Sequence, residues 1–294
     1  MLNFENVRRI AYLGPQSSFC EMAVDHFCEK NNINAYPEIC ETIGEVTEFV
    51  DNNPDTLGVL PIENSIDGTV KETIDKLCQT KNPNIKILAE FYRPANLCLL
   101  SRTTEIYSIS GIISTPEALG KCKNFIKNEM PFNVNIIEAS SIPESARLLQ
   151  GYNLTYSAIG TEKTAETFNL NVLKDNINDN KTNQTRFILF GDFETEETGN
   201  DRTSIVFSTA NKPGALLNIL NIFMKNDINL SYIASNPLNN QFGEYVITVG
   251  FDGHVQNPHI LNTLREVKEN VKYMRFLGSY RKKKPILLSQ LQMQ

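Results

Sequence analysis

The sequence predicts two domains, an α/β domain that ends near residue 191 and a smaller α+β domain that begins near residue 202. Short apolar segments alternate with amphipathic helical patterns over residues 8–190, as in layered α/β folds. Residues 192–201 (DFETEETGND) are acidic and polar, which is typical of a linker. After them the order becomes strand, helix, strand, strand, helix, strand. A chain of 294 residues is long enough for two such domains.

Strands of the first domain are expected where short runs rich in β-branched or aromatic residues are bounded by Gly, Pro, Asn or Ser. Helices are expected over 19–29 and 116–127, because their apolar residues recur at the spacing of one helix face. The expected strands are 9–13, 57–61, 85–91, 95–100, 111–114, 134–138, 156–159 and 186–190.

The second domain is expected to follow the ferredoxin-like plan, in which two helices connect four strands. The tail, residues 281–294, is basic and then amphipathic, and we expect it to be frayed or packed against another subunit. The expected strands are 202–209, 228–235, 243–251 and 271–279, and the expected helices are 214–226 and 257–269.

The composition excludes several classes of function. The net charge is −6 and both signs are interspersed, which argues against nucleic acid or a membrane as the partner. The six cysteines include no CxxC pair, and the three histidines have no metal-ligand spacing beside them, so reduced thiols and no metal are expected. The N-terminus lacks the apolar region of a signal peptide, and no run approaches the ~18 apolar residues of a membrane span. We therefore expect a cytoplasmic protein.

Four expected helix starts carry a hydroxyl cap, most of them directly after a strand. Such a start offers free backbone N–H groups and the positive end of the helix dipole to an anion. Because ligands of α/β sheets bind at the carboxyl ends of the strands, several starts meeting at one cleft would form an anion site. For each one alone, an ordinary cap is the simpler interpretation. The caps are Ser18 with Glu21, Thr69 with Glu72, Ser141 with Glu144, and Thr115 before Pro116.

Polar residues in two further segments are candidates for chemistry. In PIENSIDG (61–68), Asn64 and Ser65 follow a buried strand and are suited to holding a carboxylate. Glu63 beside them is a candidate catalytic carboxylate, and equally a candidate for an ion pair or a cap. In NQTRFILFG (183–191), Thr185 can protonate a leaving oxygen while Arg186 clamps a carboxylate. A solvated arginine at the start of a strand is the simpler alternative.

These segments resemble the signature blocks of the prephenate dehydratases. The blocks are YLGP-x-x-SF at 12–19, GVLPIENS at 58–65 followed by GTV at 68–70, and TRF at 185–187. The resemblance recurs in order over residues 8–191. It implies a catalytic domain of two lobes, like a periplasmic binding protein, with the site in the cleft between them. It also implies conversion of prephenate to phenylpyruvate, carbon dioxide and water on the route to phenylalanine, with no metal or organic cofactor.

The resemblance carries roles over to individual positions. Thr185 matches the family's catalytic threonine, and Glu63 matches the glutamate of the PIENS block, a second catalytic candidate. The chain departs from the family at Ser17, where glycine is usual, and at Thr115, where the family has histidine. These changes bear on rate and substrate choice. The positions expected to bind substrate are Ser18, Phe19, Asn64, Ser65, Ser140, Ser141, Arg186 and Phe187.

Residues 202–280 resemble the ACT domains that sense amino acids in this family. NKPGALL at 211–217 matches the phenylalanine-binding motif, whereas ASNP at 234–237 lacks the glutamate and arginine of the family's E-S-R-P. The resemblance implies phenylalanine bound between paired ACT domains, and hence a homodimer or homotetramer. An ACT domain kept for assembly alone is the alternative. The expected regulatory residues are Gly214, Ala215, Leu216, Leu217, Ser235, Asn236 and Pro237.

Three other functions are weighed against the dehydratase. A prephenate decarboxylase would share the fold, but the retained TRF block argues against it. Arogenate is an alternative substrate, and nothing in the sequence decides against it. A catalytically inactive ligand sensor is supported only by the changes at Ser17 and Thr115. Because no chorismate mutase helix precedes residue 8, prephenate is expected to come from another protein.

Overall fold

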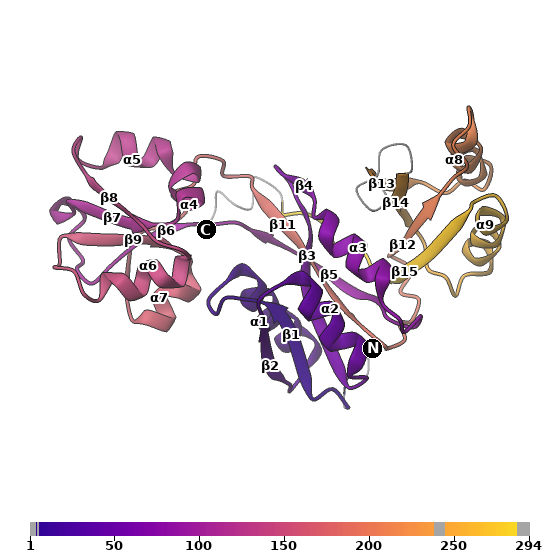
Figure 1. Ribbon diagram of the computed structural model, residues 1–294, viewed down its shortest axis with the longest axis horizontal. Coiled ribbons are helices and arrows are strands. Elements are labelled where there is room, and N and C mark those ends of the chain that lie inside the picture. The colour runs from indigo at the N-terminus through magenta and orange to yellow at the C-terminus, as the bar shows by residue number, and fades with distance from the viewer. Residues whose placement is uncertain (1–3, 5, 238–244, 287–294) are drawn as a thin grey trace.

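Three β-sheets follow one another along the longest axis of the protein in the computed structural model (Figure 1). The structure describes residue 4, residues 6–237 and residues 245–286. The first two sheets build two α/β lobes, and the third builds a separate domain. In Figure 1 the second lobe lies at the left, the first lobe in the centre and the third sheet at the right.

The first lobe contains a six-stranded mixed sheet in the order β2-β1-β3-β11-β5, with the short β4 beside β3. β1 runs parallel to β2 and β3, whereas β11 is antiparallel to both β3 and β5. Helix α1 packs on one face of this sheet, and α2 and α3 pack on the other. The elements are β1 Arg9–Leu13, α1 Phe19–Asn31, β2 Tyr36–Cys40, α2 Ile43–Asn52, β3 Thr56–Asn64, β4 Gly68–Thr69, α3 Lys71–Gln79, β5 Lys86–Pro94 and β11 Gln184–Gly191.

The second lobe contains a five-stranded sheet in the order β10-β6-β9-β7-β8. Helices α4 and α5 pack on one face, and α6 and α7 on the other. The chain enters this lobe after β5 and returns to the first lobe as β11, so two segments cross between the lobes, as expected for a periplasmic-binding-protein-like domain. The elements are β6 Cys98–Ser101, the 3-10 turn Ile106–Ser108, β7 Gly111–Ser114, α4 Pro116–Lys121, α5 Lys123–Glu129, β8 Asn135–Glu138, α6 Ile142–Leu149, β9 Tyr156–Gly160, α7 Glu162–Phe168 and β10 Asn171–Lys174.

The third sheet is antiparallel, in the order β13-β14-β12-β15, which is the ferredoxin-like order that the sequence predicts. Helices α8 and α9 cover one face, where a buried cluster includes Phe207, Phe223 and Phe251. We call this part of the chain the ferredoxin-like domain. Its elements are β12 Asp201–Ser208, α8 Ala215–Lys225, β13 Leu230–Pro237, β14 Tyr245–Asp252, α9 Pro258–Glu269 and β15 Tyr273–Arg281.

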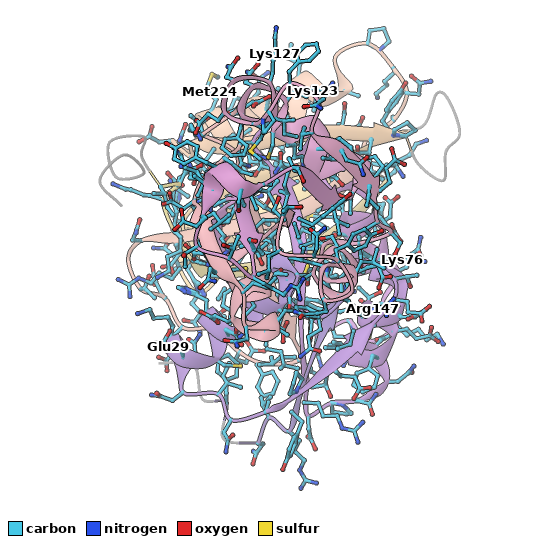
Figure 2. All side chains as sticks on the ribbon, turned by 90° about the vertical axis from the view of Figure 1, so that its left-hand side faces the viewer. Glu29, Lys76, Lys123, Lys127, Arg147 and Met224 are labelled. Carbon is cyan, nitrogen blue, oxygen red and sulfur yellow. The ribbon has the colours of Figure 1, made fainter. Side chains whose placement is uncertain are left out.

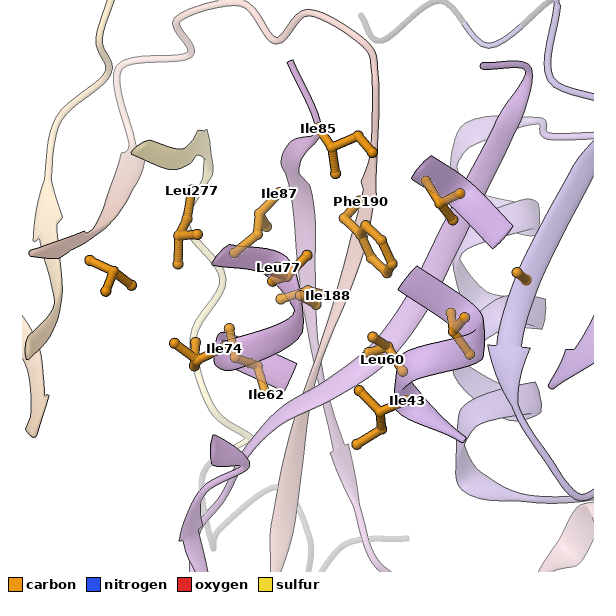
Figure 3. Packing of buried hydrophobic residues seen from close by; sticks show 14 of the residues in the cluster. Ile43, Leu60, Ile62, Ile74, Leu77, Ile85, Ile87, Ile188, Phe190 and Leu277 are labelled. Carbon is orange, nitrogen blue, oxygen red and sulfur yellow. The ribbon is translucent and has the colours of Figure 1, made fainter. Parts of the chain in front are cut away.

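The other face of the ferredoxin-like domain packs against the first lobe. Leu277 of β15 lies in the same buried cluster as Ile87 of β5 and Ile74 of α3 (Figure 3). Gly278 has a φ of +138°, and a Cβ atom there would lie 2.3 Å from the carbonyl oxygen of Ile87. Backbone therefore contacts backbone where the two domains meet. The preceding linker is also held in place, because the buried Thr195 donates a hydrogen bond to the Ser279 carbonyl oxygen over 2.6 Å.

Several local predictions were wrong, and two of them concern strands at the edge of a sheet. β2 and β10 were missed because they are edge strands that expose polar or large side chains and carry no apolar run. The expected cap at Thr69 does not form, since Thr69 belongs to β4 and α3 begins after Val70 with no side-chain cap. The single helix expected over 116–127 is two helices divided at Cys122, after the weak helix former Gly120.

Residues 243–244 of the strand expected at 243–251, and residues 287–294 of the tail, lie outside the described residues. The other caps form: Ser18, Thr115 and Ser141 each accept a hydrogen bond from a backbone N–H of the following helix.

Charged side chains of both signs lie over different parts of the surface, as Glu29, Lys76, Lys123 and Arg147 show in Figure 2. In the described ranges, no helix is long and apolar enough to cross a membrane. Over those same ranges, no group of three or more His, Cys, Asp or Glu residues is placed to hold a metal ion. All six cysteines are free thiols.

Candidate active site

A cavity of about 450 Å³ lies between the two lobes. The first lobe contributes the end of β1, the start of α1, the end of β3 and the start of β11. The second lobe contributes α4 and the first residue of α6. Of the residues expected to act on substrate, those that line this cleft are Ser18, Phe19, Asn64, Thr185 and Phe187. Thr115, the expected departure from the family, lines it as well.

The hydroxyl group of Thr185 is held by the side chain of Asn64. The two residues are paired across β3 and β11. The Asn64 Oδ1 atom accepts hydrogen bonds from the backbone N–H groups of Ile66 (2.9 Å) and Asp67 (3.1 Å), which fixes the orientation of the amide. Its Nδ2 atom then donates to Thr185 Oγ1 over 3.0 Å and to Asn183 Oδ1 over 2.9 Å. Because Thr185 Oγ1 accepts this bond, its own proton is free to point into the cleft.

Helix starts supply most of the remaining polar groups of the cleft. Ser18 Oγ accepts from the N–H of Glu21 over 3.3 Å at the start of α1, and Thr115 Oγ1 accepts from the N–H of Ala118 over 3.1 Å at the start of α4. Lys121 is the only cationic side chain among the described residues of the cavity wall, and it pairs with Glu117. An anion in this cleft would therefore depend on helix-end dipoles and backbone donors more than on cations.

Cysteine is not a candidate nucleophile in this cleft. Cys20 lies in the wall, but burial raises the pKa of its thiol to about 12. It is therefore a neutral thiol at physiological pH.

Ser17 joins the two lobes beside the cleft. It is buried and has a φ of +62°, in the left-handed region that favours glycine because glycine has no Cβ atom. Its Oγ atom donates to Thr167 Oγ1 of α7 over 2.9 Å, and its carbonyl oxygen accepts from Thr161 Oγ1 over 3.3 Å. The serine in place of glycine thus adds a hydrogen bond between the lobes, which the sequence did not lead us to expect.

Three of the expected residues lie on the side of the sheet away from the cleft. Glu63, Ser65 and Arg186 line a second cavity, of about 300 Å³, on the opposite face of the first lobe's sheet and next to the ferredoxin-like domain. The reason is that successive residues of a strand point to opposite faces. The expectation that Arg186 clamps a carboxylate beside Thr185 is corrected accordingly. The alternative of a solvated arginine is also wrong, since Arg186 is 4 % exposed.

Ser140 and Ser141 do not line the cleft either. Ser140 is exposed, and Ser141 caps α6 by accepting from the N–H of Glu144 over 3.2 Å. The next residue, Ile142, lines the cavity in their place.

The expected regulatory residues fall into two groups. Gly214, Ala215, Leu216 and Leu217 line a cavity of about 400 Å³ at the start of α8. Ser235, Asn236 and Pro237 lie on the edge strand β13 and do not line that cavity within one chain. Gly214 has a φ of +80° with open space where a Cβ atom would lie.

The chain matches known proteins over nearly its full length. The family model for prephenate dehydratase matches residues 10–195. A prephenate dehydratase of Methanocaldococcus jannaschii is 34 % identical, over 93 % of this chain and 98 % of that protein. A crystal structure of prephenate dehydratase from Arthrobacter aurescens in complex with L-Phe is 30 % identical with a TM-score of 0.79, covering 95 % of this chain and 92 % of that one.

A structure described as GqqA, a novel type of quorum quenching acylase, is also similar in fold. It has a TM-score of 0.79 at 21 % identity and covers 94 % of this chain and 98 % of that one. At this identity the likeness concerns the fold alone.

Proposed function

The chain belongs to the prephenate dehydratase family, and from this premise we propose that it converts prephenate to phenylpyruvate, carbon dioxide and water. The observation that carries the proposal is the placement of Thr185 in the cleft between the lobes, with its hydroxyl group held by Asn64. Six free thiols, four of them buried, fit a reducing cytoplasmic location.

The reaction asks the protein for two things. It has to hold the two carboxylates of prephenate, and it has to help the ring hydroxyl leave while the ring carboxylate is lost as carbon dioxide. Aromatisation of the ring supplies the driving force. The Thr185 hydroxyl donates a hydrogen bond or a proton to the leaving oxygen. Asn64 fixes the direction of that donation by occupying a lone pair of Thr185 Oγ1.

The carboxylates of prephenate would be bound mainly by the backbone N–H groups and dipoles at helix starts. The starts of α1 and α6 both reach the cavity wall, and the one cation of the described wall, Lys121, is already paired with Glu117. Phe19 and Phe187 add aromatic surface on the first lobe's side, where the product's ring forms.

Phenylalanine is the proposed effector, bound at the cavity formed by Gly214 to Leu217. The support is the resemblance of that segment to the ACT motif and the L-Phe present in the structure of the similar Arthrobacter protein. We propose a homodimer or homotetramer. Pairing of two ferredoxin-like domains would allow β13 of one chain, with Ser235, Asn236 and Pro237, to complete the cavity of the other.

The deciding experiment is to incubate the purified protein with prephenate, with and without phenylalanine, and to measure phenylpyruvate by its ultraviolet absorbance in alkali. Phenylpyruvate formation that falls when phenylalanine is added is the expected result. If phenylpyruvate forms at the same rate with and without phenylalanine, the ACT domain would serve assembly alone. Prephenate consumed without phenylpyruvate would indicate a decarboxylase. If prephenate is left intact, arogenate should be tested next, and then ligand binding without turnover.

The Asn64→Asp variant is expected to lower kcat by about 10–100-fold, because the carboxylate cannot donate to Thr185. The variant keeps the acceptor oxygen for the N–H groups of Ile66 and Asp67, so the turn should remain. Steady-state kinetics with prephenate measure the effect. Asn183→Ala is the matched control, since it removes the other partner of Asn64 Nδ2 and leaves Thr185 in place. An Asn64→Asp variant as active as the control would contradict the role given to Asn64.

A further inference from the structure

A buried carboxylate, Glu90 of β5, connects three parts of the chain behind the active-site strand. Its side chain is fully buried. It accepts hydrogen bonds from Arg186 Nη1 of β11 over 3.3 Å and from Arg202 Nη1 of β12 over 2.7 Å. It also accepts one from the backbone N–H of Lys283 over 2.8 Å. One carboxylate therefore contacts the active-site strand, the ferredoxin-like domain and the segment that follows β15.

Arg186 is enclosed by both domains. Its Nε atom pairs with Glu63 Oε2 of the first lobe over 3.1 Å. Its guanidinium lies 5.2 Å from the ring centre of Tyr232 of β13, and the Tyr232 hydroxyl is hydrogen-bonded to that of Thr69 in β4. Arg186, the residue that follows Thr185, thus lies between the ferredoxin-like domain and the first lobe.

The residue on the other side of Thr185 is tied to the segment after β15. Gln184 Nε2 donates to the carbonyl oxygen of Ile286 over 2.7 Å, and Gln184 Oε1 accepts from the N–H of Ile286 over 2.9 Å. Gln184 is therefore bonded directly to the segment after β15, whereas Arg186 contacts the ferredoxin-like domain through the Tyr232 ring and, by way of Glu90, through Arg202.

The ion pairs among Glu90, Arg186 and Arg202 make this cluster sensitive to any movement of β12. Arg186 and Arg202 are 4 % and 6 % exposed, and they share the buried carboxylate of Glu90. Moving β12 away would leave a buried carboxylate with half of its cationic partners, and such loss of a buried partner is strongly unfavourable. The cluster therefore either holds β12 and β11 together or has to rearrange, and a rearranged Arg186 displaces the strand that carries Thr185.

We propose that Glu90 and Arg202 are positioning residues, through which the ferredoxin-like domain sets the placement of Thr185 and transmits the phenylalanine signal to it. This inference rests on the proposed function, and it names the route of regulation of the same site. The route runs from Arg202 through Glu90 to Arg186, and none of the three lines the substrate cleft.

The test uses full-length Arg202→Gln with Arg275→Gln as its matched control. Arg275 is also an arginine of the ferredoxin-like domain that reaches the first lobe. Its Nη2 atom donates to Thr80 Oγ1 over 2.9 Å and to the Asn82 carbonyl oxygen over 3.2 Å, in the segment between α3 and β5. It therefore reports the effect of weakening the domain contact away from β11.

We expect Arg202→Gln to lower kcat by about tenfold with little change in KM, and to abolish the response of kcat to phenylalanine. The affinity for phenylalanine, measured by calorimetry, should stay as in the wild type, because Arg202 does not line the cavity at the start of α8. Arg275→Gln should retain the wild-type kcat and response. Arg202→Lys, which keeps the charge, should restore part of both.

An Arg202→Gln variant with unchanged kcat and unchanged phenylalanine response would overturn the inference, and so would equal losses in both variants. If Arg202→Gln does not fold, Tyr92→Phe takes its place. It removes only the hydroxyl group that accepts from Arg202 Nη1 over 3.2 Å, and it should give a smaller loss of the same kind; unchanged kinetics there would equally overturn the inference. Wild-type protein that forms no phenylpyruvate would instead overturn the proposed function itself.

Discussion

Replacing Thr185 by alanine is expected to lower kcat by about 10²–10⁴-fold while the affinity for prephenate stays nearly unchanged. The hydroxyl group acts on the leaving oxygen, and that oxygen gains its charge only in the transition state. The fold should survive, because Asn64 keeps its hydrogen bonds to Asn183 and to the turn at Ile66. Steady-state kinetics give kcat, and calorimetry with the inactive variant gives the binding constant.

Thr185→Ser is the control for this experiment. It keeps the hydroxyl group and removes only a methyl group, so most of the activity should return. A Thr185→Ala variant with normal turnover would show that the proton comes from elsewhere. A loss as large in the serine variant as in alanine would point to packing of the threonine methyl group in place of hydroxyl chemistry.

Gly278→Ala is expected to destabilise the contact between the ferredoxin-like domain and the first lobe by about 3 kcal/mol or more. Two causes add. The φ of +138° is strained for any residue with a Cβ atom, at about 1–3 kcal/mol. The new Cβ atom would also lie 2.3 Å from the Ile87 carbonyl oxygen and 2.8 Å from its nitrogen, so β15 has to move away from β5. Overpacking of this kind costs about 1–3 kcal/mol.

Urea unfolding measures the loss of stability, and kinetics with phenylalanine report whether control of the active site is lost with it. Gly199→Ala is the matched control. Gly199 has a φ of +79° and open space where a Cβ atom would lie, so it carries the strain without the clash. Equal destabilisation by the two substitutions would show that the backbone contact at Ile87 adds nothing.

The sequence predicted the order of strands and helices in the ferredoxin-like domain because each of those elements carries its own local pattern, whereas the two lobes of the first domain were expected from the family resemblance. It also predicted the caps at Ser18, Thr115 and Ser141, since a cap depends only on the next three residues. It did not predict that Arg186 and Thr185 act in different places, because this depends on which way the strand faces. That direction is set by packing against α1 on one side and the ferredoxin-like domain on the other.

The buried carboxylate of Glu90 was missed although the sequence carries a signal for it. Glu90 is the only charged residue within ILAEFY (87–92), an otherwise apolar strand, and a lone charge at such a position predicts a buried ion pair. The contact that Ser17 makes between the lobes was also missed, because the sequence shows this residue only as a departure from the family's glycine. Its bond to Thr167 depends on the second lobe, 150 residues away in the chain, and no local pattern shows that partner.

The alternation of side chains between the two faces of β11 limits how this chain can change during evolution. Odd-numbered residues from Thr185 to Leu189 face the cleft and α1, whereas Arg186, Ile188 and Phe190 face the other side. A single insertion between Phe187 and Phe190 would exchange the two sides for the residues before it, moving the arginine into the cleft and the threonine out of it. The length of β11 is therefore constrained by the two cavities on its opposite sides.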